Sequence, residues 1–163
     1  MGVGKTTIGK RLASKTGLRF FDSDTEIERR TGVEIDRIFD IEGESGFRKR
    51  EKQILEEITA MNGIVLATGG GMVLDPDNRA RLKSHGKVVY LAATPEVLVR
   101  RTARDKKRPL LRTGDRLARM NDLLAQREPI YLELADCVID TSNCTIREAA
   151  NRICLQLELE CAK

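Results

Sequence analysis

Four short apolar segments alternate with longer amphipathic segments along the whole chain. The apolar segments are residues 18–24, 63–68, 87–93 and 135–141, and a stretch with helical spacing follows each of them. Strands that are apolar on both faces and separated by helices are typical of a parallel sheet covered by helices on its two sides. The alternation therefore predicts an α/β protein with a three-layer α/β/α fold. At 163 residues, the chain is expected to form one domain, residues 1–163.

Apolar residues at helical spacing, with capping residues or glycines at the segment ends, predict the intervening helices. They are expected at residues 5–16, 25–32, 33–40, 43–61, 75–86, 94–104, 115–128 and 145–159. Gly17 should end the first helix, and Thr94 and Pro95 suit the N-cap and first helical positions. Pro129 is expected to stop the helix that begins at residue 115.

Charge and cysteine usage narrow the classes of function. Residues 100–112 hold seven basic residues against one acid, within a chain of net charge +4. Such a segment can bind nucleic acid, a membrane surface or an anionic small molecule, or can simply be solvated. No apolar run approaches the roughly 20 residues that span a bilayer, and no signal peptide is evident. The four cysteines form no C-x-x-C pair and accompany one histidine, so we expect reduced thiols in the cytoplasm rather than zinc.

The first residues match the second half of a phosphate-binding loop, whose pattern is G-x-x-x-x-G-K-[ST]. Backbone N–H groups of such a loop and of the following helix cradle phosphate oxygens. The lysine of the pattern, Lys5, would reach the β- and γ-phosphates, and the Thr6 hydroxyl would ligate Mg²⁺. The candidate nucleotide-binding residues are Gly2, Val3, Gly4, Lys5, Thr6 and Thr7.

The front of this loop falls outside the sequence. Its first glycine would lie two positions before residue 1, and a strand should precede that glycine. The alternation of strands and helices predicts the same additional strand. A start codon assigned too late and a truncated paralogue would both explain the gap. Loss of a central strand would expose the edges of its two neighbours, at a cost above the roughly 5–15 kcal/mol stability of a typical domain. We therefore expect the chain as written to be poorly folded or weakly active.

Two acids, Asp22 and Asp24, close the first apolar segment. Open α/β sheets place their ligands at the carboxyl ends of the strands. One of the two carboxylates could simply cap the next helix. Alternatively, one could hold Mg²⁺, directly or through water, while the other accepts a proton from a substrate hydroxyl.

A run of three glycines, Gly69, Gly70 and Gly71, follows the second apolar segment. Glycines allow close approach of the backbone to a ligand, although a flexible turn is the alternative. Arg48 and Arg127 lie on predicted helices, where they are either solvated or form guanidinium forks that hold a substrate carboxylate. Arg108, in the basic loop, would suit a lid that closes over a transferring phosphate.

Six motifs occur together in this order: GVGKTT, FFDSD, GFRKRE, TGGG, RDKKRPLL and QREPIY. In combination they resemble the shikimate kinase family, which has the nucleoside-monophosphate-kinase-like fold, and the resemblance covers essentially the whole chain. It implies a P-loop kinase domain with a lid at about residues 102–116. The implied reaction is ATP + shikimate → ADP + shikimate 3-phosphate, a step of aromatic amino-acid biosynthesis.

The resemblance also implies roles for individual residues. Asp24 would bind the shikimate hydroxyls and act as the base, and Asp22 would help Thr6 to hold Mg²⁺. Arg48 and Arg127 would grip the substrate carboxylate beside the glycine turn. The remaining implied contacts are to ATP, with Lys5 and Arg108 at the phosphates and Arg101 near the adenine.

Two alternatives remain open from the residues alone. The chain could be another small-molecule kinase of the same fold, such as a gluconate or nucleotide kinase. It could also be a degenerate, non-catalytic protein whose basic segment, residues 100–112, binds nucleic acid or a partner. The favoured reading is a monomeric cytoplasmic enzyme with shikimate as its partner, ATP and Mg²⁺ as cofactors, and no nucleic acid or membrane.

Overall fold

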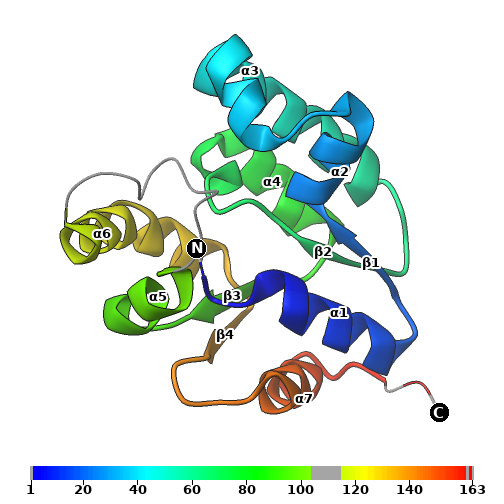
Figure 1. Cartoon of the computed structure of the whole chain (residues 1–163). Coiled ribbons are helices and arrows are strands. Elements are labelled where there is room, and N and C mark those ends of the chain that lie inside the picture. The colour runs from blue at the N-terminus through cyan, green and yellow to red at the C-terminus, as the bar shows by residue number, and fades with distance from the viewer. Residues whose placement is uncertain (1, 104–114, 161, 163) are drawn as a thin grey trace.

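The structure, a computed structural model, describes residues 2–103, 115–160 and 162. Strands and helices alternate along the chain (Figure 1). The elements are α1 (Lys5–Thr16), β1 (Arg19–Asp22), α2 (Ser23–Thr31), α3 (Ile35–Thr59), β2 (Ile64–Ala67), a 3₁₀ turn η1 (Met72–Leu74), α4 (Pro76–His85), β3 (Val89–Ala92), α5 (Pro95–Thr102), α6 (Arg116–Leu134), β4 (Cys137–Asp140) and α7 (Ile146–Gln156). None of the described helices is long and apolar enough to cross a membrane.

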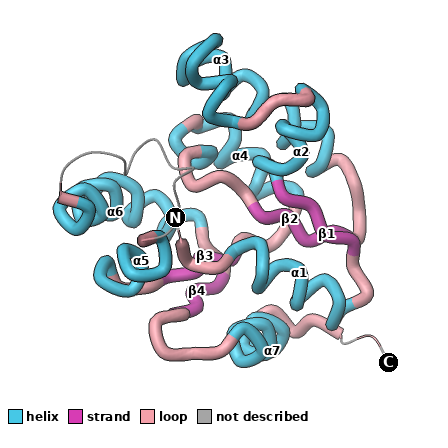
Figure 2. The backbone as a smooth tube through the Cα atoms, viewed as in Figure 1, coloured by secondary structure: helices cyan, strands magenta, loops and turns pink. Residues whose placement is uncertain are grey.

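The four strands form two parallel pairs rather than one continuous sheet (Figure 2). β1 pairs with β2 so that Arg19 lies opposite Ile64, and β3 pairs with β4 so that Val89 lies opposite Cys137. All four apolar segments are therefore strands, and the predicted parallel pairing is confirmed. Within the described part of the chain, β2 and β3 are not hydrogen-bonded to each other.

Helices cover both faces of the strands, as the three-layer prediction requires. On one side, α1 packs against α7 and against β1 and β2 (Figure 1). The apolar cluster at this face is formed by residues of α1, β4 and α7: Ile8, Leu12, Cys137, Ile139, Ala149, Ile153 and Cys154. On the other side, buried apolar residues of α2 and α3 pack against β1 and β2. Ile54 and Ile58, near the C-terminal end of α3, belong to this cluster.

Most helix ends follow the predicted capping pattern. Gly17 ends α1 in the left-handed conformation with φ 71°, and Pro95 is the first residue of α5, after Thr94. The two helices predicted at 33–40 and 43–61 run together as α3, with a break at Gly43, where φ is 68° and ψ is −176°. Only glycine adopts such a conformation readily, so this residue marks the bend.

The predicted stop at Pro129 is wrong, because α6 continues to Leu134. A proline inside a helix removes one hydrogen bond, here the bond to the carbonyl of Ala125. Both Pro129 and Ala125 are exposed, so water can solvate that carbonyl. The turn beyond the proline is fixed by tertiary contacts, since the Leu134 side chain is buried and the Tyr131 hydroxyl donates a hydrogen bond to Gly70 O.

Candidate active site

The residues at the start of α1 are the candidate phosphate-binding residues. Gly2 and Gly4 both have positive φ, 69° and 93°. A Cβ on Gly2 would lie 2.6 Å from the Thr102 Cγ2 atom, so only glycine fits this close approach. The first turn of α1 contains no acidic residue, and its N-cap residue, Gly4, has no side chain that could cap the N–H groups. Helix N–H groups without an internal partner attract anions, and those of Thr6 and Thr7 lie in an exposed turn.

Thr6 and Asp22 meet where α1 begins and β1 ends. The Thr6 hydroxyl donates a hydrogen bond of 2.7 Å to Asp22 Oδ2. The other carboxylate oxygen, Oδ1, accepts from the backbone N–H groups of Asp24 and Thr25 and so caps α2. One oxygen of Asp22 therefore caps the helix, as one of the two alternatives predicted, and the other lies beside the candidate metal-binding hydroxyl. The role of Asp22 in holding Mg²⁺ stays a prediction.

The donor set at this point suits Mg²⁺. Across the described residues there is no cluster of three or more His, Cys, Asp or Glu side chains that could form a metal cage. A cation between Thr6 and Asp22 would have one or two protein oxygens and would take its remaining ligands from water or phosphate. Mg²⁺ is commonly bound in that way, with few protein ligands and several waters.

A hydrogen bond through Ser23 joins the carboxyl ends of β1 and β2. The Gly69 N–H donates to Ser23 Oγ at 2.9 Å, and the Ser23 hydroxyl in turn lies 3.4 Å from Asp24 Oδ1. Ser23 is completely buried. This link fixes the glycine turn beside Asp24, and the sequence reading missed it because a serine between two aspartates carries no distinctive signal.

The glycine turn is packed so tightly that side chains cannot replace its hydrogens. A Cβ on Gly69 would lie 2.5 Å from Glu51 Oε1 and 3.0 Å from Asp24 Oδ1. A Cβ on Gly71 would lie 2.6 Å from Arg48 Nη1 and would also collide with Nη2. The turn therefore brings its backbone directly onto the carboxylates and the guanidinium group, and close approach, rather than flexibility, explains these glycines.

Gly70 makes the corresponding contact with α6. Its carbonyl accepts a hydrogen bond of 2.6 Å from the Tyr131 hydroxyl. A Cβ at this position would lie 3.2 Å from that hydroxyl and 3.9 Å from Arg127 Nη1. Burial raises the pKa of Tyr131, while the nearby Arg127 acts to lower it. Arg127 thus borders the same turn as Arg48, and Tyr131, four residues further along α6, is a site residue that the sequence reading missed.

Arg48 is held by two acids of its own helix. Its Nη1 donates to Glu51 Oε2 at 2.6 Å, and its Nη2 lies 2.9 Å from Glu44 Oε1. The guanidinium carbon lies 5.3 Å from the centre of the Phe47 ring. Burial acts to lower the pKa of Arg48, but the carboxylates of Glu51 and Glu44 outweigh this effect and raise it above its ordinary value. Arg48 is therefore a fixed, permanent cation at the turn.

Glu51 is the buried acid beneath this arrangement. Its side chain is 1% exposed, and within the described residues its Oε1 atom has no hydrogen-bond partner. Burial raises the pKa of Glu51, and Arg48 opposes that shift, while Asp24 adds to it. The sequence analysis did not predict Glu51 as a site residue. Arg48 and Glu51 are three positions apart on a helix, but such pairs usually lie on the solvated surface.

One further predicted residue, Arg101, lies near the start of α1. Arg101 of α5 donates two hydrogen bonds to Thr141. Its Nη2 lies 2.7 Å from Thr141 O, and its Nη1 lies 3.1 Å from Thr141 Oγ1. Its Cβ would lie 3.8 Å from a Cβ built on Gly2, so Arg101 adjoins the phosphate-binding turn. Arg108 and most of the expected lid lie outside the described residues.

These elements define a class of protein. A helix that follows a glycine turn, with a hydroxyl and a carboxylate beside it, lies next to a cleft where two arginines and an aspartate surround a second glycine turn. This is the arrangement of a P-loop kinase with an anionic small-molecule substrate. The family model for shikimate kinase matches residues 1–158, and the chain belongs to the shikimate kinase family.

Curated relatives agree with this assignment. The chain is similar to shikimate kinase from Thiobacillus denitrificans, with 56% identity over 87% of this chain and 78% of the relative. It is also similar to shikimate kinase from Nitrosococcus oceani, with 55% identity over 96% of this chain and 83% of the relative.

Solved structures give the same fold. Shikimate kinase from Acinetobacter baumannii, in complex with shikimate, is 48% identical with a TM-score of 0.93, covering 98% of this chain and 88% of that chain. A gluconokinase from Sinorhizobium meliloti has a TM-score of 0.54 at 15% identity, covering 97% of this chain and 87% of that chain. The latter likeness concerns the fold alone.

The contact of Gly71 with Arg48 yields a direct test. Gly71→Ala should displace the Arg48 guanidinium, because no room exists for a Cβ. We expect a loss of at least tenfold in kcat/KM for the family substrate, on the order of 1.4 kcal/mol or more. Gly86→Ala is the matched control, since a Cβ there meets nothing within 4 Å and its φ of 177° is extended backbone. Equal activity of the two variants would contradict this account of the turn.

Proposed function

We propose that this member of the shikimate kinase family transfers the γ-phosphoryl group of ATP to the 3-hydroxyl of shikimate. The observation that carries the proposal is the joint placement of Asp24, Arg48 and Arg127 around the turn of Gly69, Gly70 and Gly71. One acid and two cations there match a substrate that has hydroxyl groups at one end and a carboxylate at the other. Family membership and the shikimate bound to the Acinetobacter relative support the same choice.

Asp24 is proposed to orient the attacking hydroxyl and to accept its proton. It lies two residues beyond Asp22, just after the carboxyl end of β1. A base for phosphoryl transfer needs reach and orientation more than an unusual pKa, because the transition state is loose. The Ser23 hydroxyl, 3.4 Å from Asp24 Oδ1, helps to fix that orientation.

Arg48 and Arg127 are proposed to hold the substrate carboxylate. Guanidinium groups bind carboxylates through paired, charge-assisted hydrogen bonds. The fixed position of Arg48 between two acids means that it does not need to be ordered on binding, which lowers the entropic cost of association. The glycine turn lies against both arginines and so helps to set the position of their guanidinium groups.

ATP is proposed to bind across the start of α1, with its phosphates on the N–H groups of Gly2, Val3, Gly4, Lys5, Thr6 and Thr7. Lys5, the first residue of α1, would pair with the β- and γ-phosphates, and Arg101 would lie near the adenine. Thr6 and Asp22 would hold Mg²⁺, which when bound offsets charge on the phosphates. The role of Arg108 at the phosphates stays a prediction from the sequence.

We further propose that the enzyme is a cytoplasmic monomer without a nucleic-acid partner. Cys137 and Cys144 are free thiols among the described residues, in keeping with a reducing compartment.

The function is tested by ADP release with shikimate, gluconate and a nucleoside monophosphate as alternative acceptors. We expect turnover with shikimate, and a loss of about 10²-fold or more in kcat for Asp24→Asn, because removing a general base typically costs about 10²–10⁴-fold. The acceptor range separates shikimate kinase from other kinases of this fold. ADP release that does not depend on shikimate, or tight salt-sensitive nucleic-acid binding without kinase activity, would overturn the proposal.

A second test concerns Glu44, which occupies one edge of the Arg48 guanidinium. Glu44 is 61% exposed at the side chain, so a substrate carboxylate can displace it at a small cost. Glu44→Gln should therefore lower KM for shikimate by up to about fivefold, the equivalent of an exposed ion pair of up to ~1 kcal/mol, with kcat unchanged. The control is Glu42→Gln, which breaks the exposed pair with Arg50 instead. An unchanged or raised KM for Glu44→Gln would show that this acid does not compete with substrate.

A further inference from the structure

The glycine turn needs contacts from outside itself to keep one conformation. Residues 69–71 are three consecutive glycines, and glycine loses more conformational freedom on folding than any other residue. Within the turn, the Met72 N–H donates a hydrogen bond of 3.2 Å to Gly69 O. The carbonyl group of Gly70 takes no part in that bond, and its partner comes from a distant part of the chain.

The side chain that holds Gly70 is Tyr131 of α6. Its hydroxyl donates a hydrogen bond of 2.6 Å to Gly70 O. Burial raises the pKa of Tyr131 above its ordinary value, so the hydroxyl keeps its proton and stays a donor at neutral pH. The C=O group and the following N–H group of a planar trans peptide point in opposite directions. The bond that holds Gly70 O toward α6 therefore turns the Gly71 N–H away from α6.

The same helix brings Arg127 to the turn. Residues four apart lie on the same face of a helix, so Arg127 and Tyr131 leave α6 on one side. A Cβ built on Gly70 would lie 3.2 Å from the Tyr131 hydroxyl and 3.9 Å from Arg127 Nη1. The distance between α6 and Gly70, which the Tyr131 hydroxyl bridges, thus also sets how closely the Arg127 guanidinium approaches the turn.

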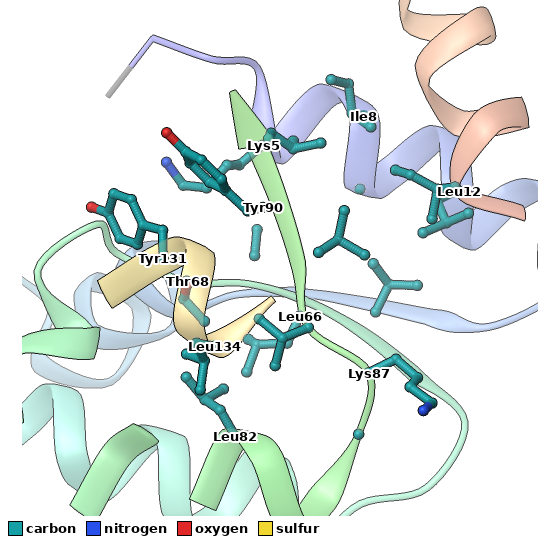
Figure 3. A pocket seen from close by; sticks show the side chains of 18 of the residues that line it. Lys5, Ile8, Leu12, Leu66, Thr68, Leu82, Lys87, Tyr90, Tyr131 and Leu134 are labelled. Atoms are coloured by element: carbon teal, nitrogen blue, oxygen red, sulfur yellow. The ribbon is translucent and has the colours of Figure 1, made fainter. Parts of the chain in front are cut away.

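A second tyrosine, Tyr90 of β3, lies beside Tyr131 but donates its hydroxyl elsewhere. The two ring centres are 5.1 Å apart, and both side chains lie in the wall of a cavity of about 410 Å³ between β2 and β3 (Figure 3). The Tyr90 hydroxyl donates to Glu128 Oε1 at 3.0 Å. Tyr90 and Tyr131 are the two tyrosines of the chain. They form a natural pair for comparison, because only the hydroxyl of Tyr131 bonds to the glycine turn.

We propose that Tyr131 is a positioning residue for substrate binding, whose hydroxyl selects one conformation of the glycine turn and places Arg127 beside it. The inference rests on the proposed function, because it takes a carboxylate substrate as the group that the turn and the arginine meet. The turn is then held from two sides. Ser23 accepts the Gly69 N–H at the end of β1, and Tyr131 donates to Gly70 O from α6.

Removal of the hydroxyl should act on binding rather than on phosphoryl transfer. Gly70 O would lose its partner, and an unpaired carbonyl favours rotation of the peptide toward water. The neighbouring glycines allow that rotation at little steric cost. The conformations of the turn would then include several that fit the substrate carboxylate poorly. Tyr131 acts at this end of the cleft, whereas the proton of the attacking hydroxyl is assigned to Asp24.

The proposal is tested by Tyr131→Phe, with Tyr90→Phe as the matched control. Each variant loses one hydroxyl and keeps its ring, so we expect both to fold with similar, small losses in Tm. Amide hydrogen exchange over residues 69–74 is measured in the free protein. KM for shikimate, KM for ATP and kcat are measured for the two variants and for the unaltered chain.

We expect Tyr131→Phe to speed exchange over residues 69–74 and to raise KM for shikimate, each by about five- to tenfold, the effect of losing one hydrogen bond. Its kcat and its KM for ATP should stay unchanged, because a contact that contributes equally to the ground and transition states affects KM alone. Tyr90→Phe should leave the exchange over these residues and all three kinetic constants unchanged.

The proposal would be overturned by equal exchange over residues 69–74 in the two variants, or by an equal KM for shikimate. A fall in kcat for Tyr131→Phe without a change in KM would overturn it as well. The exchange measurement needs no substrate, so it tests the contact even if the proposed function fails. Failure of the proposed function has its own sign, which is the lack of shikimate-dependent ADP release by the unaltered chain.

Discussion

The contact between the glycine turn and the side chains around it is the constraint on which the substrate cleft depends. Gly69 and Gly71 lie so close to Glu51 and Arg48 that an added methyl group would overlap them. The turn follows β2, and the buried Ser23 joins it to the end of β1. The spacing of the two strand ends thus sets the spacing of Asp24 and Arg48 around the turn.

The electrostatics of the cleft follow from burial. Arg48 is partly desolvated, which alone would lower its pKa. The carboxylates of Glu51 and Glu44 outweigh this effect and raise the pKa above its ordinary value. Glu51 is buried with one carboxylate oxygen against the turn, and burial raises its pKa. A buried ion pair is weak evidence for stability, because desolvation opposes the Coulomb attraction. The ion pair with Glu51 instead fixes the position of the Arg48 guanidinium group.

Much of this arrangement could be predicted from the sequence, because local signals were strong. Apolar segments gave the strands, and the order of motifs gave the family and the residues around the cleft. Ser23, Glu51 and Tyr131 were missed, because each depends on a tertiary contact that no spacing rule encodes. Pro129 misled for the same reason, since contacts of Tyr131 hold the helix beyond it. Local propensity fails where packing determines the outcome.

Arg48 and Arg127, the two arginines beside the glycine turn, are proposed to recognise the carboxylate of the substrate. The most direct measurement is calorimetric titration with shikimate and with its methyl ester, which keeps the hydroxyls and ring but has no charge. Loss of charge-assisted hydrogen bonds to two guanidinium groups should weaken binding of the ester by about 100-fold, on the order of 2–3 kcal/mol. Equal affinity for the acid and the ester would contradict the assignment of Arg48 and Arg127 to the carboxylate.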